Sequence, residues 1–316
     1  MTIEREARDQ QILGSADPAR HKGSGFALLQ ATRPRQWIKN LLVFAAPAAA
    51  GVVGHLGPFL RSAAAFAVFI AASAATYLVN DVADRAADRL HPVKRERPIA
   101  SGAVTPRAAL TLAAILLVLS LVASAVVSSG LLVVIAVYVA VTLTYTFRLK
   151  HVAVIELACV ASGFILRAVA GGAAVHVPLS PWFLLVASFG ALFIVAGKRS
   201  SEHAVMGDNR ATHRATLGEY PPAFLGTVRT LAASVAVAAY CLWAFDRSAR
   251  SAPALHVEHL VWFELSIVPF VLVMLVVELA FEQGRGGEPE ELALKDRTLQ
   301  ALGLAWIVLL LVGIYS

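Results

Sequence analysis

The sequence predicts an all-α membrane protein that crosses the bilayer several times. Of its 316 residues, 58% are hydrophobic and 15% are charged, and the mean hydropathy is +0.69. A soluble domain typically has about 25% charged residues. The apolar residues fall in nine runs, each near the ~20 residues that a helix needs to span a bilayer. We therefore expect nine transmembrane helices.

We expect two parts in the chain, a polar tail at residues 1–25 and a single transmembrane domain at residues 26–316. The tail lacks the apolar stretch of a signal peptide, and Phe26 to Arg35 forms a short amphipathic approach to the bilayer. Pro269 is expected to kink the eighth helix. The nine expected spans are residues 37–54, 61–80, 108–127, 131–147, 152–175, 181–197, 224–245, 257–281 and 299–315.

The basic residues predict the orientation. Most of the 27 Lys and Arg residues fall in segments that nine spans would place on one side, together with the N-terminus. Loops rich in Lys and Arg face the cytoplasm. We expect a multi-pass plasma-membrane protein whose N-terminus and active site face the cytoplasm. The net charge of +6 follows from this topology and not from a basic domain, so no nucleic-acid partner is expected.

Three acidic residues follow the second apolar run. Asp81, Asp84 and Asp88 are spaced i, i+3 and i+7, which places them on one face of a helix. Unpaired negative charge at the mouth of a membrane helix is costly. Mg²⁺ is commonly held by one or two carboxylates and substrate phosphates. We predict that these three residues hold Mg²⁺ and act in catalysis; the alternative is an ordinary charged loop between two spans.

Basic residues come directly after these acids. Lys94, Arg95 and Arg97 are suited to phosphate, and the planar guanidinium of arginine can bind it through two parallel hydrogen bonds. Acids for a metal ion and bases for phosphate oxygens, so close in sequence, indicate one site.

A second polar cluster follows the sixth span. Lys198 and Glu202 are four residues apart on the emerging helix, and Arg199 lies beside them. We favour a role in substrate binding, because this cluster follows the sixth span as the first follows the second. The alternative is a cytoplasmic loop with a local ion pair.

Four further residues are candidates. Tyr145 and Lys150 can face the same mouth, either as substrate ligands or as interfacial anchors. Glu156 and Arg167 lie inside the fifth span, where ionisable groups are expensive and are functional candidates by default. Alternatively, these two neutralise each other across three helical turns.

The stretch NDVADRAADRLHP, followed by KRERPIASG, resembles the first aspartate motif of the UbiA superfamily of intramembrane prenyltransferases. The resemblance covers residues 30–316 and implies a ring of helices around a central cavity. It implies that Asp81, Asp84 and Asp88 hold Mg²⁺ on a diphosphate. It further implies that Asn80 orders the site and that Arg97 binds phosphate oxygens.

The second cluster departs from the superfamily pattern. Members that transfer a prenyl group have a second aspartate-rich motif after the sixth span, and here that place reads GKRSSE, with Lys198 where an acid is expected. Together with RPRQWIKN at residues 33–40 and FRLKHVAVIE at 147–156, this makes the chain similar to the subgroup that transfers phosphoribose to decaprenyl phosphate for arabinan cell-wall synthesis. The resemblance implies 5-phosphoribosyl 1-diphosphate as donor and a polyprenyl phosphate as acceptor.

In that reaction Glu202 would contact the ribose hydroxyls or its electron-poor carbon. The sequence does not say which base binds which phosphate. Two other functions stay open: prenyl transfer to an aromatic acceptor, and transport. The lipid length, the number of Mg²⁺ ions and the oligomeric state, a homo-oligomer included, are also open. The residues expected to bind substrate are Lys39, Asn80, Lys94, Arg97, Tyr145, Lys150, Arg167, Lys198 and Arg199.

Overall fold

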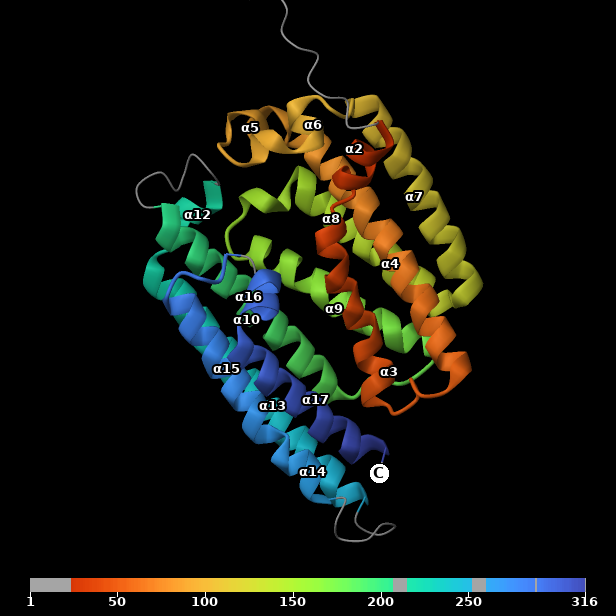
Figure 1. Ribbon diagram of the computed structural model, residues 1–316, viewed down its shortest axis with the longest axis vertical. Helices are drawn as coiled ribbons and strands as arrows, with labels where there is room; N and C mark the ends of the chain where they lie inside the picture. The colour runs from red at the N-terminus through yellow and green to blue at the C-terminus, as the bar shows by residue number, and fades with distance from the viewer. Residues whose placement is uncertain (1–23, 207–214, 252–259, 288, 316) are drawn as a thin grey trace, which may run out of the picture.

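The computed structural model describes residues 24–206, 215–251, 260–287 and 289–315, and in these ranges the chain is helical without any strand (Figure 1). The predicted polar tail falls almost entirely outside the described residues. Within the described part of the chain, eight helices are long and apolar enough to cross a membrane, and they correspond to the second to ninth expected spans. The elements that form these eight spans are α4 (Leu56–Ala83), α7 (Pro106–Val127), α8 (Ser129–Phe147), α9 (Ile155–Val175), α10 (Pro181–Met206), α13 (Pro222–Ser251), α14 (Leu260–Leu265) with α15 (Ile267–Glu282), and α17 (Arg297–Tyr315).

The eighth span is divided into α14 and α15 at Ser266. Pro269 has no N–H to donate to the carbonyl of Leu265, so the helix loses a hydrogen bond there. The helix is thus interrupted three residues before the proline that was expected to disturb it.

The first expected span is not one continuous α-helix. It consists of η1 (Pro34–Phe44), a 3₁₀-helix, followed directly by α3 (Ala45–Ala49), and the two together run along α4 and α9. Pro47 cannot donate to the carbonyl of Val43. That carbonyl instead faces Gly171 of α9 so closely that a Cβ added to Gly171 would lie 1.8 Å from its oxygen. The segment formed by η1 and α3 therefore occupies the position of the first expected span, and it packs against α9 through a close backbone contact.

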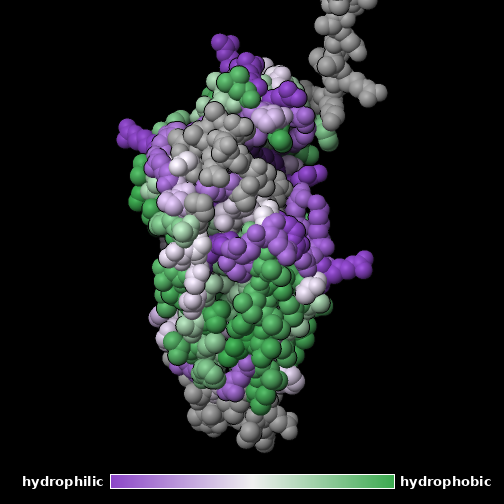
Figure 2. Space-filling model, turned by 90° about the vertical axis from the view of Figure 1, so that its left-hand side faces the viewer, coloured by the Kyte–Doolittle hydropathy of each residue, from purple (hydrophilic) through white to green (hydrophobic). Residues whose placement is uncertain are grey.

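Aromatic contacts fill the core between the helices. Phe69 of α4 meets Tyr138 of α8 edge to face, with ring centroids 5.0 Å apart. Phe193 of α10 and Phe281 of α15 lie 5.3 Å apart, and Gly197 leaves room for the Phe281 ring. On the face in Figure 2, an apolar band covers the lower part of the molecule and hydrophilic residues gather above it, as expected for a protein embedded in a bilayer.

Short elements cover the polar end of the bundle. At the top of Figure 1, α2, α5 and α6 lie over the end of α4. The charged residues of the first motif lie at the end of α4, in α5 and around η2, and those of the second lie near the end of α10, so the polar end of the bundle is where a site can form. The short elements are α2 (Ser24–Ala31), α5 (Arg85–Leu90), η2 (Lys94–Glu96), α6 (Pro98–Ser101), η3 (Leu149–His151), α12 (Ala215–Glu219) and α16 (Pro289–Lys295).

The contact between Gly171 and Val43 makes a prediction about stability. Gly171→Ala should destabilise the protein by about 1–3 kcal/mol. The added methyl group would overlap a backbone oxygen, which cannot move aside by a change of rotamer. Gly190→Ala in α10 is the control, since a Cβ there meets nothing within 4 Å and alanine favours a helix. Thermal unfolding in detergent measures both; equal melting temperatures for the two variants would contradict the close approach.

Candidate active site

A cavity of about 590 Å³ opens at the polar end of the bundle, between η1, α4, α8, α9, α10 and α16. Of the described residues, the acids that line it are Asp84 and Glu202. Seven basic side chains line it too, and although three of these are arginines paired with buried acids behind the wall, a positive excess remains, which suits an anionic ligand. These seven are Arg33, Lys39, Lys94, Arg97, Lys150, Lys198 and Arg199.

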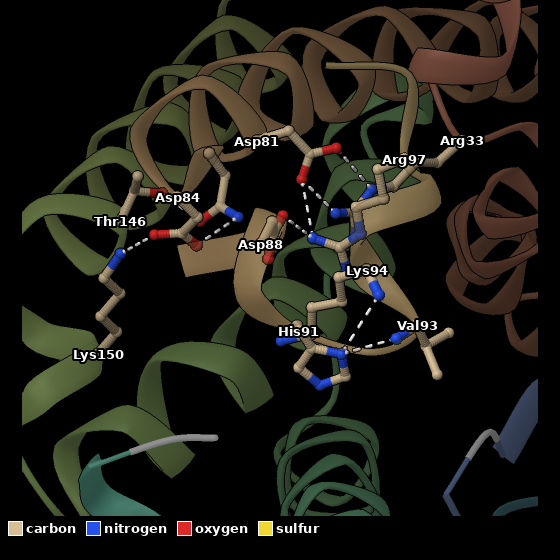
Figure 3. A network of polar contacts seen from close by, with 11 residues as sticks. Arg33, Asp81, Asp84, Asp88, His91, Val93, Lys94, Arg97, Thr146 and Lys150 are labelled. Carbon is tan, nitrogen blue, oxygen red and sulfur yellow. Dashed lines mark hydrogen bonds and ion pairs between the residues drawn. The ribbon is translucent and has the colours of Figure 1, made fainter. Parts of the chain in front are cut away.

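Two carboxylates of the first motif are joined by one arginine (Figure 3). Nη1 of Arg97 donates to Oδ1 of Asp81 at 3.2 Å and to Oδ2 of Asp88 at 2.7 Å, and Arg33 also binds Asp81. Asp81 and Asp88 are only 3% and 4% exposed, and neither lines the cavity. The arginines therefore neutralise two buried carboxylates that would otherwise be very costly.

Asp84 points the other way, toward the cavity. Helix α4 ends at Ala83, and Asp84 separates it from α5. One oxygen of Asp84 binds Nζ of Lys150, and the other accepts a hydrogen bond of 3.1 Å from Nδ2 of Asn80. Thr146 donates to Oδ1 of Asn80 at 3.2 Å, which fixes the amide.

The structure does not gather the three carboxylates around one point. In the ranges that the structure describes, no group of three or more His, Cys, Asp or Glu residues is arranged to hold a metal ion. The break at Asp84 interrupts the helical face on which the three acids were expected. Mg²⁺ is nevertheless compatible with Asp84, the acid of this motif that lines the cavity, because a single carboxylate can hold Mg²⁺ where phosphate oxygens supply further ligands.

The second cluster is organised around Arg199, which is 4% exposed. Nε and Nη2 of Arg199 donate to the two carboxylate oxygens of Glu156 at 2.8 and 2.9 Å. Nη1 of Arg199 donates to Oε2 of Glu202 at 2.8 Å. All three guanidinium nitrogens are thus bound to carboxylates, and the alternative in which Glu156 pairs with Arg167 is wrong.

Arg167 lies outside the lining of the cavity, among neutral groups. Its guanidinium donates to Oδ1 of Asn40 at 2.7 Å, to the carbonyl of Gly163 at 2.6 Å and to the hydroxyl of Tyr138 at 3.2 Å. Because Asn40 belongs to η1, Arg167 ties α9 and α8 to that segment. Arg167, which was expected to bind substrate, thus anchors η1 and lies outside the lining of the cavity.

The other predicted binding residues all line the cavity: Lys39, Lys94, Tyr145, Lys150 and Lys198. Arg33 and Thr146 were not among the residues expected to bind substrate. Both line the cavity, where Arg33 also lies over the ring of Tyr77 at 5.0 Å. Arg33 is 48 residues from Asp81, and no local pattern indicates so distant a pairing.

An apolar groove of about 570 Å³ adjoins the polar cavity. It lies between η1 and α3 on one side and α10, α13 and α17 on the other, and Ile38 lines both spaces. Aromatic side chains form much of its wall: Trp182, Phe183, Tyr240, Trp243 and Trp306. A charged cavity joined to an apolar groove suits an amphiphile with an anionic head and a hydrocarbon tail.

The sequence model of the UbiA prenyltransferase family matches residues 41–295. The chain belongs to this family. A decaprenyl-phosphate phosphoribosyltransferase of Mycolicibacterium smegmatis is 46% identical over 306 residues, which cover 95% of this chain and 96% of the relative. Enzymes of the same name from Mycobacterium tuberculosis and Corynebacterium glutamicum are 45% and 44% identical, over 89% and 91% of this chain and 91% and 86% of theirs.

Solved structures of UbiA homologues share the fold. One from Archaeoglobus fulgidus bound to GPP and Mg²⁺ has a TM-score of 0.67 at 17% identity, covering 91% of this chain and 98% of that one. The apo structure of a homologue from Aeropyrum pernix gives 0.57 at 20% identity, over 84% and 97%. The all-helical UbiA fold expected from the sequence is confirmed.

The shared arginine predicts a stability effect at the first motif. Arg97→Gln should lower the stability by about 1–3 kcal/mol, because buried oxygens of Asp81 and Asp88 lose a charged partner. Arg95→Gln is the matched control, since Arg95 is exposed and should change stability by less than about 0.5 kcal/mol. Thermal unfolding of the two variants tests the pairing, and equal melting temperatures would argue against it.

Proposed function

We propose that this chain transfers the 5-phosphoribosyl group from 5-phosphoribosyl 1-diphosphate to a polyprenyl phosphate, and that this lipid is decaprenyl phosphate. The observation that carries the proposal is the strongly basic cavity joined at Ile38 to an apolar groove. Such a pair of spaces serves a reaction between a water-soluble polyphosphate and a lipid phosphate. The names of the relatives that are 44–46% identical support it.

In the reaction, an oxygen of the lipid phosphate attacks C1 of the ribose. The bond from C1 to the diphosphate breaks, and pyrophosphate leaves with the bonding electrons. A phosphate monoester is already anionic at neutral pH, so no general base is needed. The protein must align nucleophile, carbon and leaving group and balance their negative charge.

Asp84, presented to the cavity beside Asn80, is the residue that would hold Mg²⁺ together with diphosphate oxygens. When bound, the metal would stabilise the charge that develops on departing pyrophosphate. Asp81 and Asp88 would act indirectly, because they fix the position of the Arg97 side chain, which also lines the cavity. A metal ligand and a basic side chain thus stand next to one another at the place proposed for the diphosphate.

The lipid phosphate is assigned to the part of the cavity next to Lys39. Lys39 follows Ile38, the residue shared with the apolar groove, so a phosphate near Lys39 lets the lipid tail enter that groove. Lys150 and Lys198 are assigned to the other phosphate groups of the two substrates. Tyr145 lines the same cavity, and Glu202 is the acid available to the ribose hydroxyls or to the electron-poor C1.

The polar end is assigned to the cytoplasmic side of the plasma membrane. Its cavity holds seven of the basic residues, and loops rich in Lys and Arg stay in the cytoplasm. A soluble phosphorylated sugar would reach the cavity from that side, while the lipid would enter from the bilayer.

The direct test supplies purified protein with labelled 5-phosphoribosyl 1-diphosphate, decaprenyl phosphate and Mg²⁺. Labelled phosphoribose in the lipid fraction, with release of one pyrophosphate, is expected. A parallel reaction contains a prenyl diphosphate and an aromatic acceptor. Product only in this second reaction would overturn the proposal and favour aromatic prenyl transfer.

Asp84→Asn should nearly abolish transfer while leaving the fold intact. The amide keeps the shape but removes the one motif carboxylate that lines the cavity, so we expect at least about a 100-fold loss of kcat/KM, or about 2.7 kcal/mol. Asp246→Asn in α13, outside the cavity lining, is the control and should behave as the parent protein. The rate is measured across a Mg²⁺ titration; near-normal activity of Asp84→Asn at low Mg²⁺ would rule out this metal site.

Glu202→Gln should lower kcat more than it raises KM for the ribosyl donor. A carboxylate beside the electron-poor carbon stabilises the transition state more than the bound substrate, so its loss appears mainly in kcat. We expect a decrease of about 10- to 150-fold, as for a charge-assisted hydrogen bond. Steady-state kinetics with each substrate varied in turn test this, and unchanged constants would remove Glu202 from the site.

A further inference from the structure

The start of α9 has an unusual backbone. Val154 has φ 66° and ψ −47°, and the N–H of Ile155 donates to the carbonyl of Ala153 at 2.8 Å, which closes a three-residue turn around Val154. A β-branched residue is rarely found at positive φ, and this turn is a strained form. The strain needs a local restraint, and such restraints cluster at functional sites.

Tyr220 supplies the restraint. Its hydroxyl accepts a hydrogen bond of 2.8 Å from the N–H of Val154. Tyr220 lies between α12 and α13 in the chain, and its side chain is buried. Burial, with a contribution from nearby Glu156, raises the pKa of Tyr220, so the phenol keeps its proton at neutral pH. Tyr220 therefore holds the strained turn through a neutral hydroxyl.

The turn fixes Glu156 in the first turn of α9. Its carboxylate is fully buried, and it binds Arg199 through two hydrogen bonds of 2.8 and 2.9 Å. The N-terminal end of a helix also favours negative charge. A buried ion pair stabilises little in itself, but its two parallel bonds define the position of the arginine.

Arg199 in turn fixes Glu202. Its remaining terminal nitrogen donates to Oε2 of Glu202 at 2.8 Å, and the Glu202 side chain is 23% exposed at the cavity wall. The contacts run from Tyr220 to Val154, and from Glu156 through Arg199 to Glu202. Only Arg199 and Glu202 of this series line the cavity.

We infer that Glu156 is a positioning residue, which acts through Arg199 to aim the Glu202 carboxylate at the ribosyl group, and that Tyr220 supports it by holding the turn at Val154. This inference rests on the proposed function. It separates the roles of the second cluster: Arg199 orients an acid and is not a phosphate ligand, whereas Glu202 faces the donor.

The test is a double-mutant cycle between Glu156→Gln and Glu202→Gln. Glu156→Gln keeps the size of the side chain but removes the charge and places an NH₂ group against the guanidinium. It should lower kcat about 10- to 150-fold and leave KM for decaprenyl phosphate within about 3-fold. If Glu156 acts through Glu202, the double variant Glu156→Gln/Glu202→Gln should be no slower than Glu202→Gln alone.

Tyr220→Phe keeps the inference testable where Glu156→Gln does not fold. It removes the hydroxyl that accepts from Val154 and that also bonds to Glu156, so we expect a kcat about 3- to 10-fold lower, again with no further loss when Glu202 is already Gln. Glu278→Gln is the matched control. Glu278 of α15 pairs with buried Arg229 of α13 at 3.3 Å and lies outside the cavity lining. The kcat of this variant should therefore stay at the parent value.

If the decreases in kcat multiply in the double variants, Glu156 and Tyr220 serve only the fold, and the inference is overturned. A parent-like kcat in a folded Glu156→Gln variant would overturn it as well. Failure of the proposed function is recognised separately, because the unsubstituted protein would then transfer no phosphoribose.

Discussion

Charge pairing within an apolar bundle is the constraint on which the polar end of this protein depends. An acid buried at the mouth of membrane helices needs a cation close by. Asp81 and Asp88 obtain theirs from Arg33 and Arg97, and Glu156 obtains its cation from Arg199. Each pair joins segments that are distant along the chain or belong to different elements. The elements around the cavity are therefore positioned by ion pairs as well as by apolar packing.

This pairing also determines the charge that the cavity presents. Asp81, Asp88 and Glu156 are buried and do not line the cavity, whereas their basic partners Arg33, Arg97 and Arg199 all do. A ligand entering the cavity thus meets guanidinium and ammonium groups, with Asp84 and Glu202 as the acids in reach. The buried acids thus fix the positions of these arginines at the cavity wall.

Apolar runs were sufficient to predict the spans, because the length of a membrane helix follows from the thickness of the bilayer. The break in the eighth span before Pro269 was predictable for a similar reason, since proline removes a known hydrogen bond. The form of the first span was not. Its 3₁₀ helix lies in close contact with α9 at Val43 and Gly171, two residues that no periodicity relates.

The residue types of the site were also predictable, but their partners were not. Spacing on an ideal helix put Asp81, Asp84 and Asp88 on one face, whereas the break at Asp84 turns one acid into the cavity and leaves two with Arg97. Glu156 and Arg199 are 43 residues apart, and only the packing of α9 against α10 brings them together. Sequence patterns report which charges lie near a membrane surface; which of them pair is decided by tertiary packing.

The two clusters are built in the same way, with some charged groups buried in ion pairs and one acid at the cavity wall. In the first, Arg97 bridges two buried carboxylates, and Asp84 remains at the cavity wall. In the second, Arg199 binds one buried carboxylate and holds Glu202 at the wall. Each cluster thus combines a buried ion pair, which resists movement because breaking it would strand a charge, with one accessible acid. Because preorganised charge costs no reorganisation during the reaction, this arrangement suits a transfer whose chemistry lies in aligning and balancing phosphates.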